Sequence, residues 1–200
     1  MEENPDARIV EMDTVYNDVS NGPFIQAFKF LQYDLLICIY HESKTTDEML
    51  RGILLLEQYL GLDIFNAEVE VLLTDRESEF VSASEAEYRE DGSRRTRVYY
   101  CDSMCSWQKG SLENVHLLLR EICPNKTDLY ALGLTSQEKA NIISSHINSY
   151  PKKKLKGKSS FQLLEFINQD MADRLYQAGL SAVQSDEVTL KPYLLKTNGR

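Results

Sequence analysis

The stretch Glu68-Val69-Glu70-Val71-Leu72-Leu73-Thr74-Asp75 decides how the rest of this chain is interpreted. Its apolar run stops abruptly at Asp75 and a polar turn follows, which predicts a buried strand with an acid at its carboxyl end. In open α/β sheets, ligands and chemistry collect at the carboxyl ends of strands. Asp is also a common turn former and helix cap, so the argument for a site at Asp75 depends on its neighbours.

Three strands are predicted before this one. Residues 7–16 form a short β-rich stretch that carries Asp13 in its middle, and turn formers fill residues 17–23. Residues 24–30 alternate as the second arm of a hairpin, and residues 34–40 form a continuous apolar run typical of a central strand. The sequence therefore predicts three antiparallel strands before any helix.

A helix is predicted between the third and fourth strands. Thr45 and Glu48 have the spacing of a capping box, apolar residues then recur at helical spacing, and Gly61 is predicted to end the helix. A crossover through a helix of this length lays the next strand parallel to an earlier one. The expected order is β-β-β-α-β, followed by further helices.

The second half of the chain predicts another strand and helix. Residues 82–97 are polar and predict a short helix with a solvated loop, residues 98–101 a short strand, and residues 102–110 a loop. Ser111 is predicted to cap a helix whose apolar face carries Leu112, Val115, Leu119 and Ile122. Glu113, His116 and Arg120 lie on the opposite face of that helix and are predicted to face outward.

Composition limits the class of protein. The 200 residues suffice for one domain with a sizeable core, and shares of 42% hydrophobic and 26% charged residues are typical of globular proteins. The chain shows neither a membrane-spanning run nor a signal sequence, which predicts a cytoplasmic protein. The net charge of −9 argues against a surface built throughout to hold nucleic acid.

The four cysteines predict reduced thiols rather than disulfides, because they show no CxxC pair and no signal sequence precedes them. Cys101 and Cys105 would make half of a zinc site. No second half is visible, so zinc is not expected.

Three motifs in order carry a resemblance to a known family. They are Met12-Asp13-Thr14-Val15, the segment from Leu73 to Phe80 with Asp75, and the segment from Trp107 to Asn114 with Glu113. Together they resemble the catalytic core of insertion-sequence transposases of the IS-thirty type, in the retroviral-integrase superfamily. The resemblance covers residues 8–166 and includes a weaker match in residues 147–161, similar to the Asn-x-x-Pro-Arg and Lys-Thr-Pro signature of such cores.

The resemblance implies an RNase-H-like α/β fold, the integrase catalytic core, with a mixed sheet that begins with three antiparallel strands and has helices on both faces. Residues 1–168 would be the core and residues 169–200 a C-terminal tail. The N-terminal helix-turn-helix region of full-length relatives is expected to be absent. Asp13, Asp75 and Glu113 would be the catalytic residues and the ligands of Mg²⁺ or Mn²⁺, with two ions expected, since hard oxygen ligands suit these metals.

The implied reaction is metal-dependent cleavage and transfer of DNA strands, with transposon ends and target DNA as partners and a homo-oligomer as the active form. Candidate phosphate contacts are His116 and Arg120 beyond Glu113, Lys109 before it, and the basic run Lys152, Lys153 and Lys154. A solvated helix face and a solvated basic loop are the alternative interpretations of these positions.

Two departures from the family pattern leave alternatives open. Glu77 stands where family members usually have Gly, and Glu113 follows Asp75 by 38 positions, slightly more than is usual in the superfamily. An insertion in residues 82–97 would absorb the extra length. The alternatives are a truncated, inactive transposase remnant that acts as an interaction or regulatory module, and a metal-dependent nuclease that hydrolyses DNA without joining it.

Overall fold

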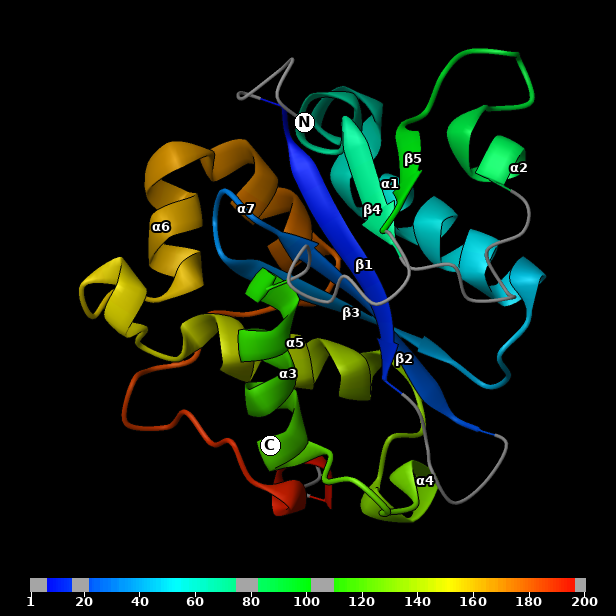
Figure 1. The fold of residues 1–200 in the computed structure, drawn as a ribbon. Coiled ribbons are helices and arrows are strands. Elements are labelled where there is room, and N and C mark those ends of the chain that lie inside the picture. The colour runs from blue at the N-terminus through cyan, green and yellow to red at the C-terminus, as the bar shows by residue number, and fades with distance from the viewer. Residues whose placement is uncertain (1–6, 16–21, 75–82, 102–109, 197–200) are drawn as a thin grey trace.

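A five-stranded mixed sheet forms the centre of the computed structural model, with strand order β3-β2-β1-β4-β5 (Figure 1). The structure describes residues 7–15, 22–74, 83–101 and 110–196, with the backbone alone for residues 110–114. The strands are β1 (Ile9–Val15), β2 (Phe24–Phe30), β3 (Leu35–His41), β4 (Val71–Thr74) and β5 (Arg97–Tyr100). The helices are α1 (Thr46–Glu68), α2 (Ala83–Glu87), α3 (Gly110–Ile122), α4 (Leu129–Leu132), α5 (Gln137–Ser149), η3 (Lys153–Leu155), α6 (Ser160–Ile167), α7 (Gln169–Gln177) and η4 (Pro192–Lys196).

Strand pairing confirms the predicted order of antiparallel and parallel strands, but the prediction that residues 34–40 form a central strand was wrong, because β3 lies at the sheet edge. Its run is apolar throughout because Leu35, Ile37 and Ile39 face one core cluster and Leu36 and Cys38 the other. β1 pairs antiparallel with β2, and β2 pairs antiparallel with β3, so three antiparallel strands precede the first helix. After the crossover through α1, β4 pairs parallel with β1, and β5 pairs parallel with β4. The sheet is therefore mixed, and β1 is its central strand.

Helices cover both faces of the sheet, as predicted (Figure 1). Val10 and Met12 of β1 pack with the apolar faces of α1, α6 and α7, together with Ala86 of α2. Val15 of β1 lies in a second core cluster with α3, α4, α5 and η4. Successive side chains of a strand point to opposite faces, so β1 contributes to both cores and Asp13 lies on the α3 and α5 side.

Helix α1 differs from the prediction at Gly61, which was predicted to end it, and at Thr45, which was predicted to start a capping box. It continues to Glu68 through a break at Gly61, whose φ of 73° is left-handed. Ile64 and Phe65 are buried beyond the break, which explains why the chain resumes helical structure there. At the other end Thr45 Oγ1 accepts the N–H of Glu48 at 3.3 Å, but the Glu48 carboxylate contacts His41 and Arg51 instead of closing a capping box.

Edge strand β3 is capped along its outer side by polar side chains of α5. The N–H groups of Leu36 and Cys38 donate to Asn148 Oδ1 at 2.8 Å and to Ser144 Oγ at 2.9 Å. The N–H of Tyr40 donates to Gln137 Oε1 at 2.8 Å. Unpaired backbone groups at a sheet edge are a template for adding another strand, and these side chains occupy them.

The C-terminal residues pack on the core. Met171 and Leu175 of α7 are fully buried in the same cluster as α1. Beyond α7 the chain runs along α5, where the N–H groups of Ser181 and Val183 donate to the hydroxyl oxygens of Ser145 and Ser149. The sequence left open whether this segment packs on the core, and the structure shows that it does.

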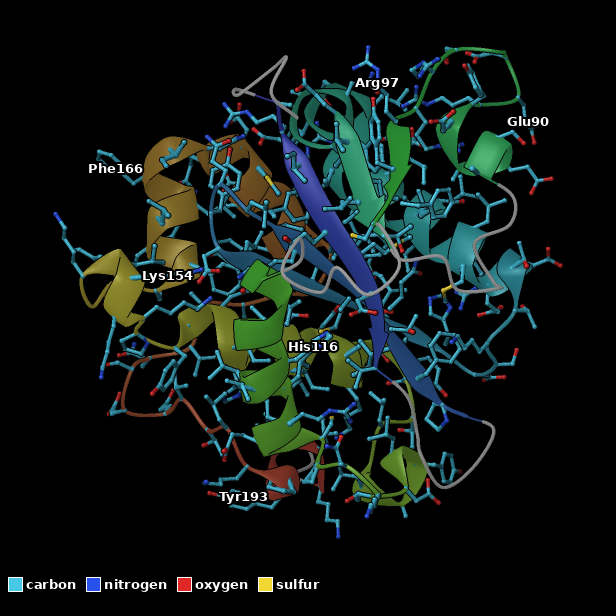
Figure 2. The ribbon with its side chains drawn as sticks, in the orientation of Figure 1. Glu90, Arg97, His116, Lys154, Phe166 and Tyr193 are labelled. Carbon is cyan, nitrogen blue, oxygen red and sulfur yellow. The ribbon has the colours of Figure 1, made fainter. Side chains whose placement is uncertain are left out.

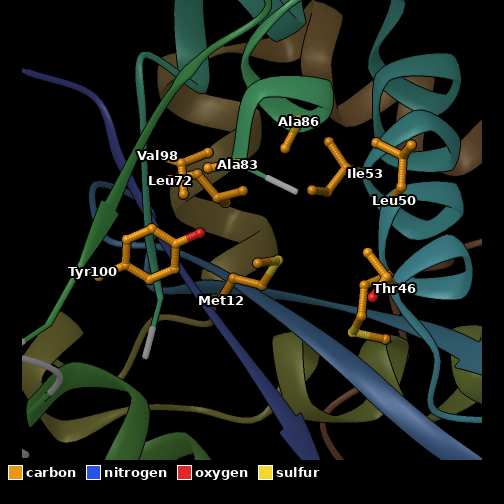
Figure 3. A pocket seen from close by; sticks show the side chains of 10 residues that line it. Met12, Thr46, Leu50, Ile53, Leu72, Ala83, Ala86, Val98 and Tyr100 are labelled. Carbon is orange, nitrogen blue, oxygen red and sulfur yellow. The ribbon is translucent and has the colours of Figure 1, made fainter. Parts of the chain in front are cut away.

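Two further observations concern membrane-spanning helices and cavities. No helix in this part of the chain is both long and apolar enough to cross a membrane. Figure 3 shows an apolar cavity between α1, α2 and the sheet, lined among others by Met12, Ile53 and Tyr100. Its volume of about 20 Å³ is close to that of one water molecule, so it is a packing gap rather than a ligand site.

Candidate active site at the centre of the sheet

Asp13 lies near the end of the central strand, on the face covered by α3. Its side chain is 20% exposed, and its Oδ1 accepts the N–H of Thr14 at 2.8 Å. Its cross-strand neighbour on β2 is the small, buried residue Ala27. Asp13 is therefore positioned by rigid sheet structure and remains accessible from one side.

Strand β4 runs beside β1 toward the end of the strand that carries Asp13. It runs parallel to β1 with Val10 beside Leu72 and Glu11 beside Leu73, and it ends at Thr74. Asp75, the next residue in the chain, lies outside the described residues. The described register thus brings the two chain segments that precede the two predicted acids side by side.

Helix α3 contributes the third segment. Val115 and Leu119 anchor the helix in the core, and His116 Nε2 lies 3.6 Å from Asp13 Oδ2. Positions three residues apart share a helix face, so the face that carries the Glu113 backbone position is the one turned toward β1. The prediction that this face points outward was wrong for His116, whose side chain is 29% exposed and lies against Asp13. Figure 2 labels His116 on α3. The side chain of Glu113 is not described.

The basic residues predicted to bind DNA fall into different environments. Arg120 is half-buried, and its buried Nη1 makes no hydrogen bond within the described part of the chain. Lys153 is exposed, and Lys109 lies outside the described residues. Lys154 is 49% exposed and pairs with Asp34 Oδ1 at 2.6 Å.

Lys152 is used differently from the prediction of a phosphate contact. Its ammonium is buried, and it donates to the Asp34 carbonyl at 2.8 Å and to Ser160 Oγ at 2.7 Å. Its distance to Asp34 Oδ2 is 3.0 Å. We therefore leave Lys152 out of the proposed DNA surface and assign it to the interior.

Lys29 completes this interior network, and sequence analysis did not single it out. It lies fully buried in β2, donates to the Asp34 carbonyl at 2.7 Å and forms an ion pair with the Asp34 carboxylate. Burial, together with the charge of Lys152, lowers the pKa of Lys29 to about 7. A lysine between Phe28 and Phe30 in an apolar strand was the only available signal of it in the sequence.

We expect protein stability to rise between pH 7 and pH 9 because of Lys29. In this range the unfolded lysine keeps a proton that the folded one releases, so the unfolded state binds more protons and stability increases with pH. Urea unfolding of the parent and of Lys29→Met at several pH values will measure the effect. The rise should be smaller in the variant, and parallel curves would contradict the assignment.

Within the described residues, no three His, Cys, Asp or Glu side chains come together as a metal site. Two of the three predicted ligands are outside this comparison, since neither Asp75 nor the Glu113 side chain is described. Cys101 is buried, whereas Cys105 lies outside the described residues. The donor chemistry near Asp13 is that of carboxylate oxygen, which suits hard divalent ions.

Curated relatives are transposases of insertion sequences. The chain is 39% identical over 79 residues to the transposase for insertion sequence element IS1086 of Cupriavidus metallidurans, a match that covers 40% of this chain and 22% of that protein. It is 33% identical over 73 residues to transposase InsI for insertion sequence element IS30A of Escherichia coli K12, covering 36% and 18% of the two chains. The matches therefore span about a fifth of the length of these relatives, and no family model matches the chain.

Solved structures with a similar fold include retroviral integrase catalytic cores. The HTLV-2 integrase catalytic core domain in complex with magnesium, in its trimeric form, has a TM-score of 0.54 at 14% identity and covers 78% of this chain and 95% of that one. The catalytic core domain of BIV integrase has a TM-score of 0.53 at 15% identity and covers 78% and 92%. These similarities confirm the predicted RNase-H-like fold and, with the curated relatives, the resemblance to transposases of the IS-thirty type.

Proposed function

We propose that this chain is the catalytic core of a DNA transposase that cleaves and transfers DNA strands. The observation that carries the proposal is the position of Asp13. It lies on the central strand of an integrase-type fold, beside the strand that leads into Asp75 and beneath the helix that carries Glu113. The curated relatives, which are transposases, support the same function.

In this proposal Asp13, Asp75 and Glu113 hold Mg²⁺ or Mn²⁺. A pair of such ions supplies Lewis-acid stabilisation of the attacking and leaving oxygens in an in-line displacement at phosphorus. Among the residues of this chain, the three carboxylates would hold the metal ions beside the reacting phosphate. No side chain is proposed as a covalent nucleophile. The integrase core that was solved with magnesium supports the choice of metal.

DNA would approach the open side of Asp13, next to α3. His116 and Arg120 on α3, with Lys109 before it, are the proposed phosphate contacts near the acids, and Lys153 and Lys154 are proposed contacts further away. Transposon ends and target DNA are the proposed substrates. A homo-oligomer is the proposed active form, supported by the dimeric and trimeric forms of the similar integrase core.

Titration of the chain with Mn²⁺ by calorimetry will test the metal site. We expect the parent to bind Mn²⁺ and Asp75→Asn to bind it at least about tenfold more weakly, because the variant loses an anionic ligand. Asp186→Asn is the matched control, since Asp186 is exposed on the C-terminal segment. Its affinity should equal that of the parent.

A short DNA duplex is added in a second titration, because DNA phosphate can complete the coordination of the metal. Absence of Mn²⁺ binding by the folded parent in both titrations would refute the catalytic proposal. The inactive remnant would then be the better description of the chain.

A further inference from the structure

A groove of about 510 Å³ opens between η3 and α6, far in sequence from the three predicted acids. Leu155, Leu163 and Phe166 provide its apolar lining. Lys154, Lys156 and Lys158 bring ammonium groups to it, and Gln162 completes the lining. We call this the basic groove.

Phe166 is the most unusual residue of the basic groove. It is 89% exposed at the end of α6, and Figure 2 shows its ring projecting away from the helix into solvent. Phe161 and Leu164 on the opposite face of α6 already anchor the helix in the core. Ile167, the next residue, is 48% exposed, so the end of α6 presents two large apolar side chains to solvent.

The lysine-bearing wall of the groove is preformed. The N–H of Lys152 donates to the Lys158 carbonyl, and the N–H of Gly157 donates to the Lys152 carbonyl, both at 3.0 Å. Lys156 and Gly157 adopt left-handed φ values of 54° and 85°, which fold the segment into a tight turn. The buried bonds of Lys152 to Asp34 fix this turn to the core, so a ligand need not order it.

The charges of the groove remain available to a ligand. Lys156 and Lys158 are exposed and have no ion-pair partner within the described ranges 7–15, 22–74, 83–101 and 110–196. Lys154 pairs with Asp34 and is already a proposed DNA contact, so the charge available to a further ligand is that of Lys156 and Lys158. A second copy docked groove to groove would bring these lysines against one another, which argues against self-association through this face.

We propose that the basic groove binds an acidic, amphipathic segment of a partner protein. A large apolar side chain of that segment packs between Leu155, Leu163 and Phe166, and flanking carboxylates pair with Lys156 and Lys158. Duplex DNA would satisfy the lysines, but its phosphates would leave the apolar lining without a matching partner. An acidic peptide with apolar residues complements both parts of the groove.

Fluorescence anisotropy with a defined peptide will test this proposal. The probe is fluorescein-labelled Glu-Glu-Leu-Phe-Glu-Glu-Leu-Asp, and the full chain is the binding partner. We expect saturable binding that weakens at least about tenfold in Phe166→Ser, from lost apolar burial, and by a similar factor in the double variant Lys156→Glu, Lys158→Glu. Tyr193→Ser with Lys196→Glu is the matched control, since it changes an exposed aromatic residue and an exposed lysine elsewhere and should bind as the parent does.

Three results would overturn the proposal. One is equal binding of a probe in which Ser replaces Leu and Phe, because charge alone would then suffice. Another is unchanged binding by the groove variants, and the third is displacement of the probe by single-stranded DNA at comparable affinity, which would assign the groove to nucleic acid. The readout needs no catalysis, and none of the substituted residues is a proposed metal ligand, so failure here leaves the proposed transposase function intact.

Discussion

Replacing Asp13 by Asn is expected to slow metal-dependent cleavage of DNA by at least about a thousandfold, equivalent to about 4 kcal/mol of transition-state stabilisation. The substitution removes the negative charge that holds a divalent ion but keeps the size of the side chain. Its Oδ1 can still accept the N–H of Thr14, as the Asp13 carboxylate does at 2.8 Å, so the fold should persist. The loss would then be chemical rather than structural.

Nicking of supercoiled plasmid in Mn²⁺ will measure this effect without knowledge of the recognised end sequence. Circular dichroism will check that Asp13→Asn has the secondary structure of the parent. Asp186→Asn should nick plasmid at the parental rate. If Asp13→Asn nicks as fast as the parent, Asp13 is not a metal ligand of the reaction.

The same plasmid separates transposase from nuclease. A labelled oligonucleotide with a free 3′-hydroxyl should become joined to the plasmid if the chain transfers strands. Nicked plasmid without joined oligonucleotide would favour the nuclease, because water alone would then serve as nucleophile.

Replacing Asp34 by Asn is expected to lower the free energy of unfolding by about 3–5 kcal/mol. Asp34 pairs with the buried amino groups of Lys29 and Lys152, which have no other ion-pair partner within the described residues. At a pH below the pKa of Lys29 its removal therefore leaves both positive charges uncompensated. Asn adopts left-handed φ readily, so the φ of 52° at this position adds little to the loss. The cost therefore comes from uncompensated buried charge.

Urea unfolding followed by circular dichroism will measure the change. Asp63→Asn is the control, because Asp63 is 74% exposed and its pairing with Arg174 at 3.9 Å is a surface ion pair expected to contribute about 1 kcal/mol or less. Adding Lys29→Met to Asp34→Asn should restore part of the stability, since it removes one stranded charge. A loss below about 1 kcal/mol for Asp34→Asn would mean that the lysines are held neutral or hydrated.

The sequence alone determined the order of the main elements, but it predicted residues 34–40, and not the strand of Asp13, as a central strand. Alternating and continuous apolar runs report which residues face a core, and a helix between two such runs forces a parallel return. These signals lie within short windows, so β1 to β4 and the crossover helix could be predicted. The prediction failed at Thr45 because the Glu48 carboxylate contacts His41 and Arg51 instead of the helix start. It failed at Gly61 because Phe65 is buried beyond the break and the helix continues.

Only the tertiary structure decided the roles of Lys152 and Asn148. Both lie in the stretch that resembles the terminal signature of transposase cores, and Lys152 had been predicted to contact phosphate. Lys152 bonds to Asp34, 118 positions away, while Asn148 bonds to the backbone of Leu36, 112 positions away. The run of lysines in the sequence shows which charged groups need a partner. Which residue becomes that partner depends on contacts between distant parts of the chain. The same packing turned the His116 face of α3 toward Asp13 and seated the C-terminal segment on α5.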